Sequence, residues 1–349
     1  MFKPNYSISP KLLTNLTQIE RFYGQIESEE LIPSIALRLQ NENIALATHH
    51  STSIEGNPLT PTEVTNVILG DRIPTTKAEK EVRDYFEALV HLDSYKQDKR
   101  PLDSELILEL HGLTMKHAKD DRIGEYRDSK VVVGHTELVD GAATIKVKHD
   151  PPVHTAEDIE KLLKELISWF TNDKTTPAIL KAGIFHHWFV FIHPFFDGNG
   201  RVTRLITSYL LMLSGYEVSR YFILDDYYDI DRLLYSDMLH SADEGNHTQW
   251  LEYFTDGLVY SLQAAMAKIT EYKEAKLEHV KGDNRALVTK REEDVLRIVM
   301  ELKTVRSSDI SKRFSVSRQQ AFRLLDSLVE KQILEKKGKT KASYYKLAK

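Results

Sequence analysis

Apolar residues recur three and four positions apart along most of this 349-residue chain. That spacing places them on one face of a helix, so a mainly α-helical fold is predicted. Helices are expected over residues 31–50, 76–97, 103–118, 155–172, 178–195, 201–215 and 251–280. The segments 178–195 and 201–215 are so apolar that these two helices are expected in the core. Asp103 and Thr155 are expected to cap the helices that they begin.

Residues 130–152 depart from the helical pattern. Two runs rich in β-branched residues flank a Gly-containing turn there, and two prolines follow. This pattern predicts a β-hairpin. An isolated hairpin is only marginally stable, so we expect it to lie on the helical body, with an outer edge that could accept another strand.

The C-terminal region has a different pattern, which begins after a linker over residues 281–290. A helix over 291–302 is followed by a short helix capped near Ser307 and a longer helix capped near Ser317. Two short strands around a Lys/Gly turn complete the region. This order of elements resembles a winged helix-turn-helix, and a winged-helix domain is predicted over residues 285–349.

The charge of the chain is unevenly distributed. Residues 288–349 contain 16 Lys and Arg against 8 Asp and Glu, a net charge of +8, whereas the whole chain carries −5 and the remainder therefore −13. A basic winged helix is a candidate for DNA binding, although such domains also bind proteins or form dimers. The candidate DNA contacts are Arg318, Gln319, Gln320 and Arg323 in the recognition helix, and Lys336, Lys337, Lys339 and Lys341 in the wing.

Composition narrows the possible chemistry and location. The chain has no cysteine, which excludes disulfides, thiolate metal ligands and a cysteine nucleophile. We find neither an apolar core of signal-peptide length at the N-terminus nor an apolar run of 18 residues. The expectation is therefore a soluble cytoplasmic protein without a membrane partner.

The histidines give no zinc signature. His186, His187 and His193 do not have the spacing of zinc ligands on a helix, and the first two are expected to be core residues. No recognisable cluster is formed by five further histidines, His49, His50, His135, His149 and His154.

The segment HPFFDGNGRVTR, residues 193–204, combines the groups of a phosphate site. Its glycines allow backbone N–H groups to converge on an anion, and Asn199 could donate its side-chain amide there. A helix that starts near Arg201 would add the positive end of its dipole, and Arg201 and Arg204 would lie on one side of its first turn. Asp197 could hold Mg²⁺ that bridges phosphates, and His193 could accept a proton from an attacking hydroxyl.

The same segment resembles the motif of the Fic family, His-Pro-Phe-x-Asp/Glu-Gly-Asn-Gly-Arg-x-x-Arg, at every defined position. Fic proteins are typically protein adenylyltransferases, which move AMP from ATP to a hydroxyl side chain of a target protein. The resemblance implies that His193 is the general base and Asp197 the Mg²⁺ ligand. It also implies that Gly198, Asn199 and Gly200 form the anion hole, with Arg201 and Arg204 on the phosphates of ATP.

The resemblance also implies a subclass and a domain plan. Related Doc proteins carry lysine in place of Gly200 and transfer the γ-phosphate, so glycine favours AMP transfer. The Fic catalytic core is expected over residues 101–280, preceded by an N-terminal helical region over residues 1–100. The hairpin, which we place near residues 130–150, resembles the Fic flap that binds the target by strand addition, with Gly124, Tyr126 and Arg127 leading into it.

A second motif, STSIEGN over Ser51–Asn57, fits the Fic inhibitory motif Ser/Thr-x-x-x-Glu-Gly/Asn through Ser51, Glu55 and Gly56. The resemblance implies that Glu55 pairs with Arg204 and prevents it from holding the γ-phosphate. Tyr235 is the candidate aromatic contact for adenosine. A homodimer that buries the inhibitory region is a further expectation from the resemblance.

Two alternatives to this reading stay open. The chain could be a DNA-binding transcriptional regulator whose Fic body senses nucleotide without turnover. It could also be a Fic enzyme that transfers another phosphate-containing group or removes AMP.

Overall fold

The computed structural model describes residues 2–349 except 30–32, 70–72, 120–121, 140–141, 219–220, 280–289, 315, 331–332, 339–342 and 348–349. The chain forms two compact units: Met1–Ser28 with Glu42–Met266, and Glu29–Asn41 with Ala267–Lys349. Within the described residues, no helix combines the length and apolar character needed to cross a membrane. The predicted linker over residues 281–290 lies almost entirely outside the described residues.

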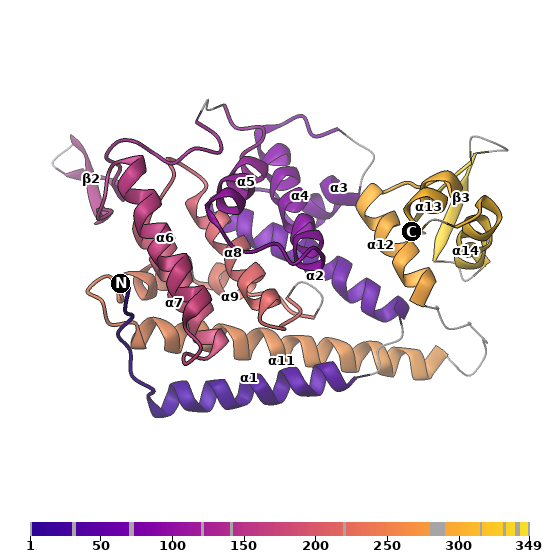
Figure 1. Cartoon of the computed structure of the whole chain (residues 1–349), viewed down its shortest axis with the longest axis horizontal. Coiled ribbons are helices and arrows are strands. Elements are labelled where there is room, and N and C mark those ends of the chain that lie inside the picture. Colours follow the sequence, from indigo (N-terminus) through magenta and orange to yellow (C-terminus); the bar gives the residue numbers. More distant parts are fainter. Residues whose placement is uncertain are drawn as a thin grey trace. The chain divides into compact units, whose positions relative to one another are not determined.

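Helices dominate the fold, as predicted (Figure 1). They are α1 (Pro10–Ser28), α2 (Pro33–Ile54), α3 (Pro61–Leu69), α4 (Lys77–Gln97), α5 (Ser104–Thr114), α6 (Ala156–Asn172), α7 (Ala178–Ile192), α8 (Asn199–Leu213), α9 (Asp225–Ile230), α10 (Arg232–His240), α11 (Thr248–His279), α12 (Lys290–Leu302), α13 (Ser307–Arg313) and α14 (Arg318–Glu330). Two antiparallel hairpins complete the fold: β1 (Val133–Val139) with β2 (Ala142–His149), and β3 (Leu334–Lys337) with β4 (Tyr344–Leu347).

Most of the predicted caps are present. The side chain of Asp103 accepts from Leu106 N at 2.8 Å, and that of Thr155 accepts from Asp158 N at 3.2 Å. Ser317 caps α14 by accepting from Gln320 N at 3.2 Å. The cap expected near Ser307 lies at the residue before it, Arg306, and α13 begins at Ser307.

Helix α8 is the centre of the first unit. Every residue of α8 except Gly200 and Leu213 is buried. It packs against α4, α5 and α7, and Figure 1 shows α7 and α8 side by side. This confirms the prediction of two core helices, and it places the loop between α7 and α8 on a rigid support.

The second unit has its own small core. Val299, Leu325 and Tyr345 are fully or almost fully buried there, and Leu37 of α2 packs against the same cluster. The backbone of Val305 exchanges two hydrogen bonds with that of Tyr345, at 2.8 and 2.9 Å, which ties β4 to the segment before α13. The predicted order of three helices and two strands is therefore present in this unit.

Candidate active site

The loop from His193 to Gly198 joins the two core helices, α7 and α8, and the side chain of Asn199 fixes its shape. The Asn199 amide accepts from Phe195 N at 2.9 Å and donates to Phe195 O at 2.8 Å. The amide oxygen and one of the two amide N–H groups are therefore used by the loop backbone, and donation to an anion by Asn199 stays a prediction. Gly198 has φ +79°, the left-handed conformation that glycine adopts without strain.

Arg127 holds the end of this loop that carries His193. Its guanidinium is fully buried and donates to four backbone carbonyls, those of His193 at 2.7 Å, Ile192 at 3.2 Å, Val153 at 2.6 Å and Ser129 at 2.9 Å. Two of these carbonyls belong to the end of α7, and the other two flank the β1–β2 hairpin. One side chain therefore joins the hairpin base to the loop that carries His193.

His193 itself sits in a strained and largely desolvated position. As the C-cap of α7 it has φ 50° and ψ 64°, which is uncommon for a residue with a side chain. Burial lowers the pKa of His193 to about 4, and the neighbouring His149 and Arg127 act in the same direction. At neutral pH its imidazole is therefore uncharged and retains a lone pair that can accept a proton.

The N-terminus of α8 presents the groups expected for an anion. Its N-cap is Gly198, so no N-cap side chain is present to accept from the first-turn N–H groups. Arg201 is buried, and its Nε is a buried donor without an acceptor among the described residues. A phosphate at this helix end would satisfy both kinds of donor.

Asp197 lies at the mouth of the same site. Its side chain is 69% exposed, and its Oδ1 accepts from Gly198 N at 2.6 Å. Mg²⁺ in phosphate sites is commonly held by one or two carboxylates together with phosphate oxygens and waters. An exposed carboxylate beside an anion-binding helix end fits that requirement.

Arg204 is occupied by the two residues that the inhibitory motif predicts. Its Nη2 donates to Glu55 Oε1 at 2.8 Å and to the carbonyl of Ser51 at 2.8 Å, and its Nε donates to Ser51 Oγ at 2.7 Å. The Arg204 side chain is 1% exposed, whereas that of Glu55 is 34% exposed. The carboxylate therefore reaches Arg204 from the solvent side, where a phosphate would approach.

The end of α2 explains why a glycine follows Glu55. Gly56 has φ +89°, Gly56 N donates to Ser53 O at 2.9 Å, and Asn57 N donates to Thr52 O at 3.1 Å. These are the contacts of a helix that stops at a left-handed glycine. Because α2 stops here, Glu55 lies at the helix end. Its Oε1 comes so close to Gly200 that a Cβ on that residue would lie only 2.2 Å away. The carboxylate thus lies directly on the first turn of α8.

Tyr235, the candidate adenosine contact, lies in the aromatic core. It is 6% exposed, its hydroxyl lies 2.8 Å from His186 Nε2, and its ring stacks on Tyr228 with centroids 4.4 Å apart. Its contact with adenosine stays a prediction. The prediction that His186 and His187 are core residues is confirmed, since they are 0% and 2% exposed.

Two residues of the site escaped the sequence analysis. His111 of α5 stacks flat on Phe195, with centroids 3.8 Å apart, and accepts from Gly124 N at 2.9 Å through Nδ1. Asp225 is buried close to Arg204, and burial raises the pKa of Asp225 to about 6. No local sequence signal points to either residue, because each contacts a partner far away along the chain.

The candidate DNA contacts lie on one helix of the second unit. Arg318, Gln319, Gln320 and Arg323 are all exposed on α14. Gln320 also has a structural role, because its side-chain oxygen accepts from Ser317 N at 3.0 Å. Lys336 and Lys337 are exposed on β3, and Lys339 and Lys341 lie outside the described residues.

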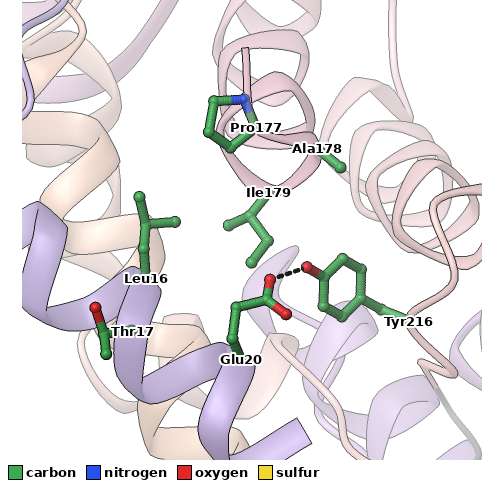
Figure 2. A pocket seen from close by; sticks show the side chains of 7 residues that line it. All are labelled: Leu16, Thr17, Glu20, Pro177, Ala178, Ile179 and Tyr216. Carbon is green, nitrogen blue, oxygen red and sulfur yellow. Dashed lines mark hydrogen bonds between the residues drawn. The ribbon is translucent and has the colours of Figure 1, made fainter. Parts of the chain in front are cut away.

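A separate hollow lies beside α1, and it lacks the groups of an active site. Its volume is about 280 Å³, and it is lined by Leu16, Thr17, Glu20, Pro177, Ala178, Ile179 and Tyr216 (Figure 2). Glu20 is the one carboxylate in the lining, and it already accepts a hydrogen bond from the Tyr216 hydroxyl. The hollow therefore offers no free acid, base or nucleophile.

The fold and the site together define a helical domain in which a buried histidine and a helix N-terminus that fits an anion lie on one short loop. Comparison with known proteins agrees: residues 101–211 match the sequence model of the Fic/DOC family. The chain is 28% identical over 235 residues to protein adenylyltransferase Fic of Nematostella vectensis, covering 64% of this chain and 49% of that protein. It is 28% identical over 200 residues to protein adenylyltransferase fic-1 of Caenorhabditis elegans, covering 54% and 36%.

Solved structures share the fold. A Fic family protein from Desulfovibrio desulfuricans G20 superposes with a TM-score of 0.64 at 24% identity, over 99% of this chain and 98% of that one. Fic-1 (residues 134–508) of Caenorhabditis elegans superposes with a TM-score of 0.60 at 23% identity, over 75% and 72%. The match to the Fic/DOC family model is limited to residues 101–211, and the chain spans about half the length, or less, of the curated relatives it matches.

Proposed function

We propose that this chain is a protein adenylyltransferase that moves AMP from ATP to a hydroxyl side chain of a target protein or of itself. The observation that carries the proposal is the arrangement around the α7–α8 loop. A neutral His193 and the open N-terminus of α8, with the unpartnered Nε of Arg201, lie on the two ends of one short loop. The relationship to Fic adenylyltransferases supports the same reaction.

The proposed reaction joins the target hydroxyl oxygen to the α-phosphorus of ATP. His193 accepts the hydroxyl proton, the bond from the α-phosphorus to the bridging oxygen breaks, and pyrophosphate leaves with that electron pair. Arg127 keeps the His193 backbone in the conformation that presents the imidazole. The first-turn N–H groups of α8 and Arg201 bind the phosphates.

Asp197 would hold Mg²⁺, which neutralises phosphate charge when bound. The hairpin is the proposed docking site for the target, because a two-stranded sheet leaves an unpaired edge to which an extended segment can add. We further propose that Glu55 inhibits the reaction by holding Arg204, since the γ-phosphate and the carboxylate would need the same guanidinium.

ATP labelled at either the α- or the γ-phosphate tests these proposals together. Wild type, Glu55→Gly and His193→Ala would each be incubated with Mg²⁺, alone and with cell lysate. We expect α-label on protein, increased about 10- to 100-fold in Glu55→Gly, because a hydrogen bond between charged groups contributes about 1.5–3 kcal/mol. His193→Ala should transfer no label.

The control is Glu125→Gly, which removes an exposed loop carboxylate and should leave the rate unchanged. Transfer of γ-label alone would show that the reaction is phosphoryl transfer and not adenylyl transfer. Equal rates in wild type and Glu55→Gly would refute the inhibitory role while leaving the reaction itself in place.

We also propose that the second unit binds DNA as a winged helix. Its order of three helices and two strands supports this assignment. So does the exposed face of α14, which presents Arg318, Gln319 and Arg323 to solvent.

A further inference from the structure

Three histidines from separate parts of the first unit contact a single carboxylate, that of Asp243. His149 Nδ1 lies 3.3 Å from Asp243 Oδ2, and His240 Nδ1 lies 3.0 Å from the same oxygen. His187 Nε2 lies 3.0 Å from the other oxygen, Oδ1. The structure therefore corrects the sequence analysis, which found no cluster around His149.

The cluster is held by four elements of the fold. His149 ends β2, His187 lies within α7, His240 ends α10, and Asp243 follows in the next turn. The side chains of His149 and His187 are 4% and 2% exposed, whereas those of His240 and Asp243 are 25% and 26% exposed. The group is thus closed on one side and open to solvent on the other.

The tautomer of His149 indicates that a cation belongs here. Its Nε2 lies 2.8 Å from the carbonyl oxygen of Phe191, which can only accept, so Nε2 carries a hydrogen. In a neutral ring, Nδ1 then has a lone pair that points at the Asp243 carboxylate, also an acceptor. That contact is repulsive unless a positive charge lies between the two atoms, either a proton on Nδ1 or a metal ion.

Among the described ion pairs, no arginine or lysine neutralises the Asp243 carboxylate, so a metal ion could do so. A second group of possible ligands, His49, His50 and Asp229, shows the contrast. There Arg232 Nε donates to Asp229 Oδ1 at 2.7 Å, so a guanidinium already neutralises the carboxylate. In the ion pairs of the described residues, Asp243 meets imidazoles only, which are metal ligands when neutral.

We propose that His149 Nδ1, His240 Nδ1 and Asp243 Oδ2 bind a divalent transition-metal ion, with Zn²⁺ as the expected occupant. The three atoms lie within 4.8 Å of one another. Zn²⁺ takes such ligands at about 2.0–2.2 Å in a tetrahedron, whose edges are then about 3.3 Å. The observed N–O separations of 3.3 and 3.0 Å lie close to that edge.

The remaining contacts would support the ion. His187 orients the carboxylate through Oδ1, and the Phe191 carbonyl fixes the tautomer of His149, as partners of metal ligands commonly do. The fourth position of the tetrahedron would face solvent. The ion would fasten the end of β2 to α10, beside the α7 turn that leads to His193, independently of which group the enzyme transfers.

Calorimetric titration of the metal-free, full-length protein with Zn²⁺ tests the site. We expect one saturable site in wild type, and a rise in Kd of at least about tenfold in His240→Gln. His240 is partly exposed at a helix end, so this variant should fold, and circular dichroism would check it. Asp243→Asn is the second variant, and His91→Gln, an exposed histidine on α4, is the matched control.

Three other results would each exclude this metal site. Equal Zn²⁺ affinity in wild type, His240→Gln and Asp243→Asn would overturn the proposal. If only His50→Gln weakened binding, the ion would belong to the His49–His50–Asp229 group. If wild type bound no Zn²⁺ and NMR showed both nitrogens of His149 protonated, the cluster would be an ion pair with imidazolium and no metal site.

Discussion

Arg204 shows how much a single guanidinium determines in this protein. It makes three hydrogen bonds to this region, two to Ser51 of α2 and one to Glu55, the residue that follows α2. A buried arginine without these partners would need another anion, and phosphate is the anion that the neighbouring helix end can bind. At the scale of residues, the proposed inhibition and the proposed catalysis therefore depend on the same atoms.

Ser51→Ala should release part of the inhibition. The substitution removes the hydroxyl that Arg204 Nε contacts at 2.7 Å but leaves the contact with the Ser51 carbonyl. The loss of one hydrogen bond of about 1 kcal/mol predicts a roughly three- to tenfold rise in AMP transfer, smaller than for Glu55→Gly. Initial rates with α-labelled ATP measure it. Ser53→Ala, whose hydroxyl contacts Arg232, is the control and should change the rate much less.

The rate of the Glu55→Gly variant should depend little on pH in the neutral range. The base must be unprotonated, and the pKa of His193 is about 4, so the active form is lost only as the pH falls toward that value. We expect kcat/KM to change less than about twofold between pH 5 and pH 8 on account of His193. A midpoint between pH 6 and 7 would contradict this, unless it disappears in Asp225→Asn, because the pKa of Asp225 is about 6.

At the scale of elements, the hairpin and the catalytic loop are joined by polar contacts. Arg127 binds carbonyls on both sides of that junction, and His149 at the end of β2 bonds the Phe191 carbonyl at the end of α7. Because the hairpin has only two strands, these contacts are what hold its base in place. A target segment added to the hairpin edge would thereby be registered against His193.

Arg127→Lys should destabilise the first unit. Lysine keeps the charge but lacks the planar fork, so it leaves some of the four buried carbonyls unpaired. We expect the free energy of unfolding to fall by about 2–4 kcal/mol. Urea denaturation followed by tryptophan fluorescence measures this unit alone, because Trp169, Trp188 and Trp250 all lie in it. Arg21→Lys, an exposed change on α1, should have an effect close to zero.

The sequence predicted elements better than it predicted side-chain partners. Helix caps such as Asp103 and Thr155 depend on neighbours three residues away, so their signals are local. Glu55 and Arg204 were connected only because each lies in a recognisable motif. The sequence did not predict that Asn199 bonds the loop backbone or that Tyr235 is buried, since the direction of an amide and the burial of a ring depend on the folded backbone. The Asp243 cluster joins the local pair His240 and Asp243 to His149 and His187, which lie far away along the chain.

At the scale of the whole molecule, opposite charges are separated along the chain. Residues 288–349 carry +8 and the rest −13. A basic module can bind DNA through phosphate contacts even though the net charge of the protein is negative. The proposed nucleotide chemistry and the proposed DNA binding thus belong to different parts of the chain. A variant in one part should therefore leave the activity of the other part unchanged.

The double variant Arg318→Glu, Arg323→Glu should weaken DNA binding and leave AMP transfer unchanged. Each lost phosphate contact should reduce the slope of log K against log salt by about 0.9. Fluorescence anisotropy with duplex DNA between 50 and 200 mM salt measures this slope. Lys77→Glu, a fully exposed change on α4, is the control. If wild type bound no DNA at the lowest salt, the proposed DNA binding would be refuted, and protein binding would be the function to test for this unit.

The ion pair between Arg204 and Glu55 has a consequence for how the protein would respond to ATP. Under the proposed function, Glu55 is an inhibitor attached to its own enzyme, so its effective concentration at Arg204 is set by the fold, at about millimolar or above, and does not change on dilution. ATP would compete from solution at whatever concentration the surroundings provide. The fraction of molecules in which ATP replaces Glu55 on Arg204 would then follow the ratio of these two concentrations, each divided by its own dissociation constant. The protein would therefore sense nucleotide supply through mass action, before any partner displaces α2.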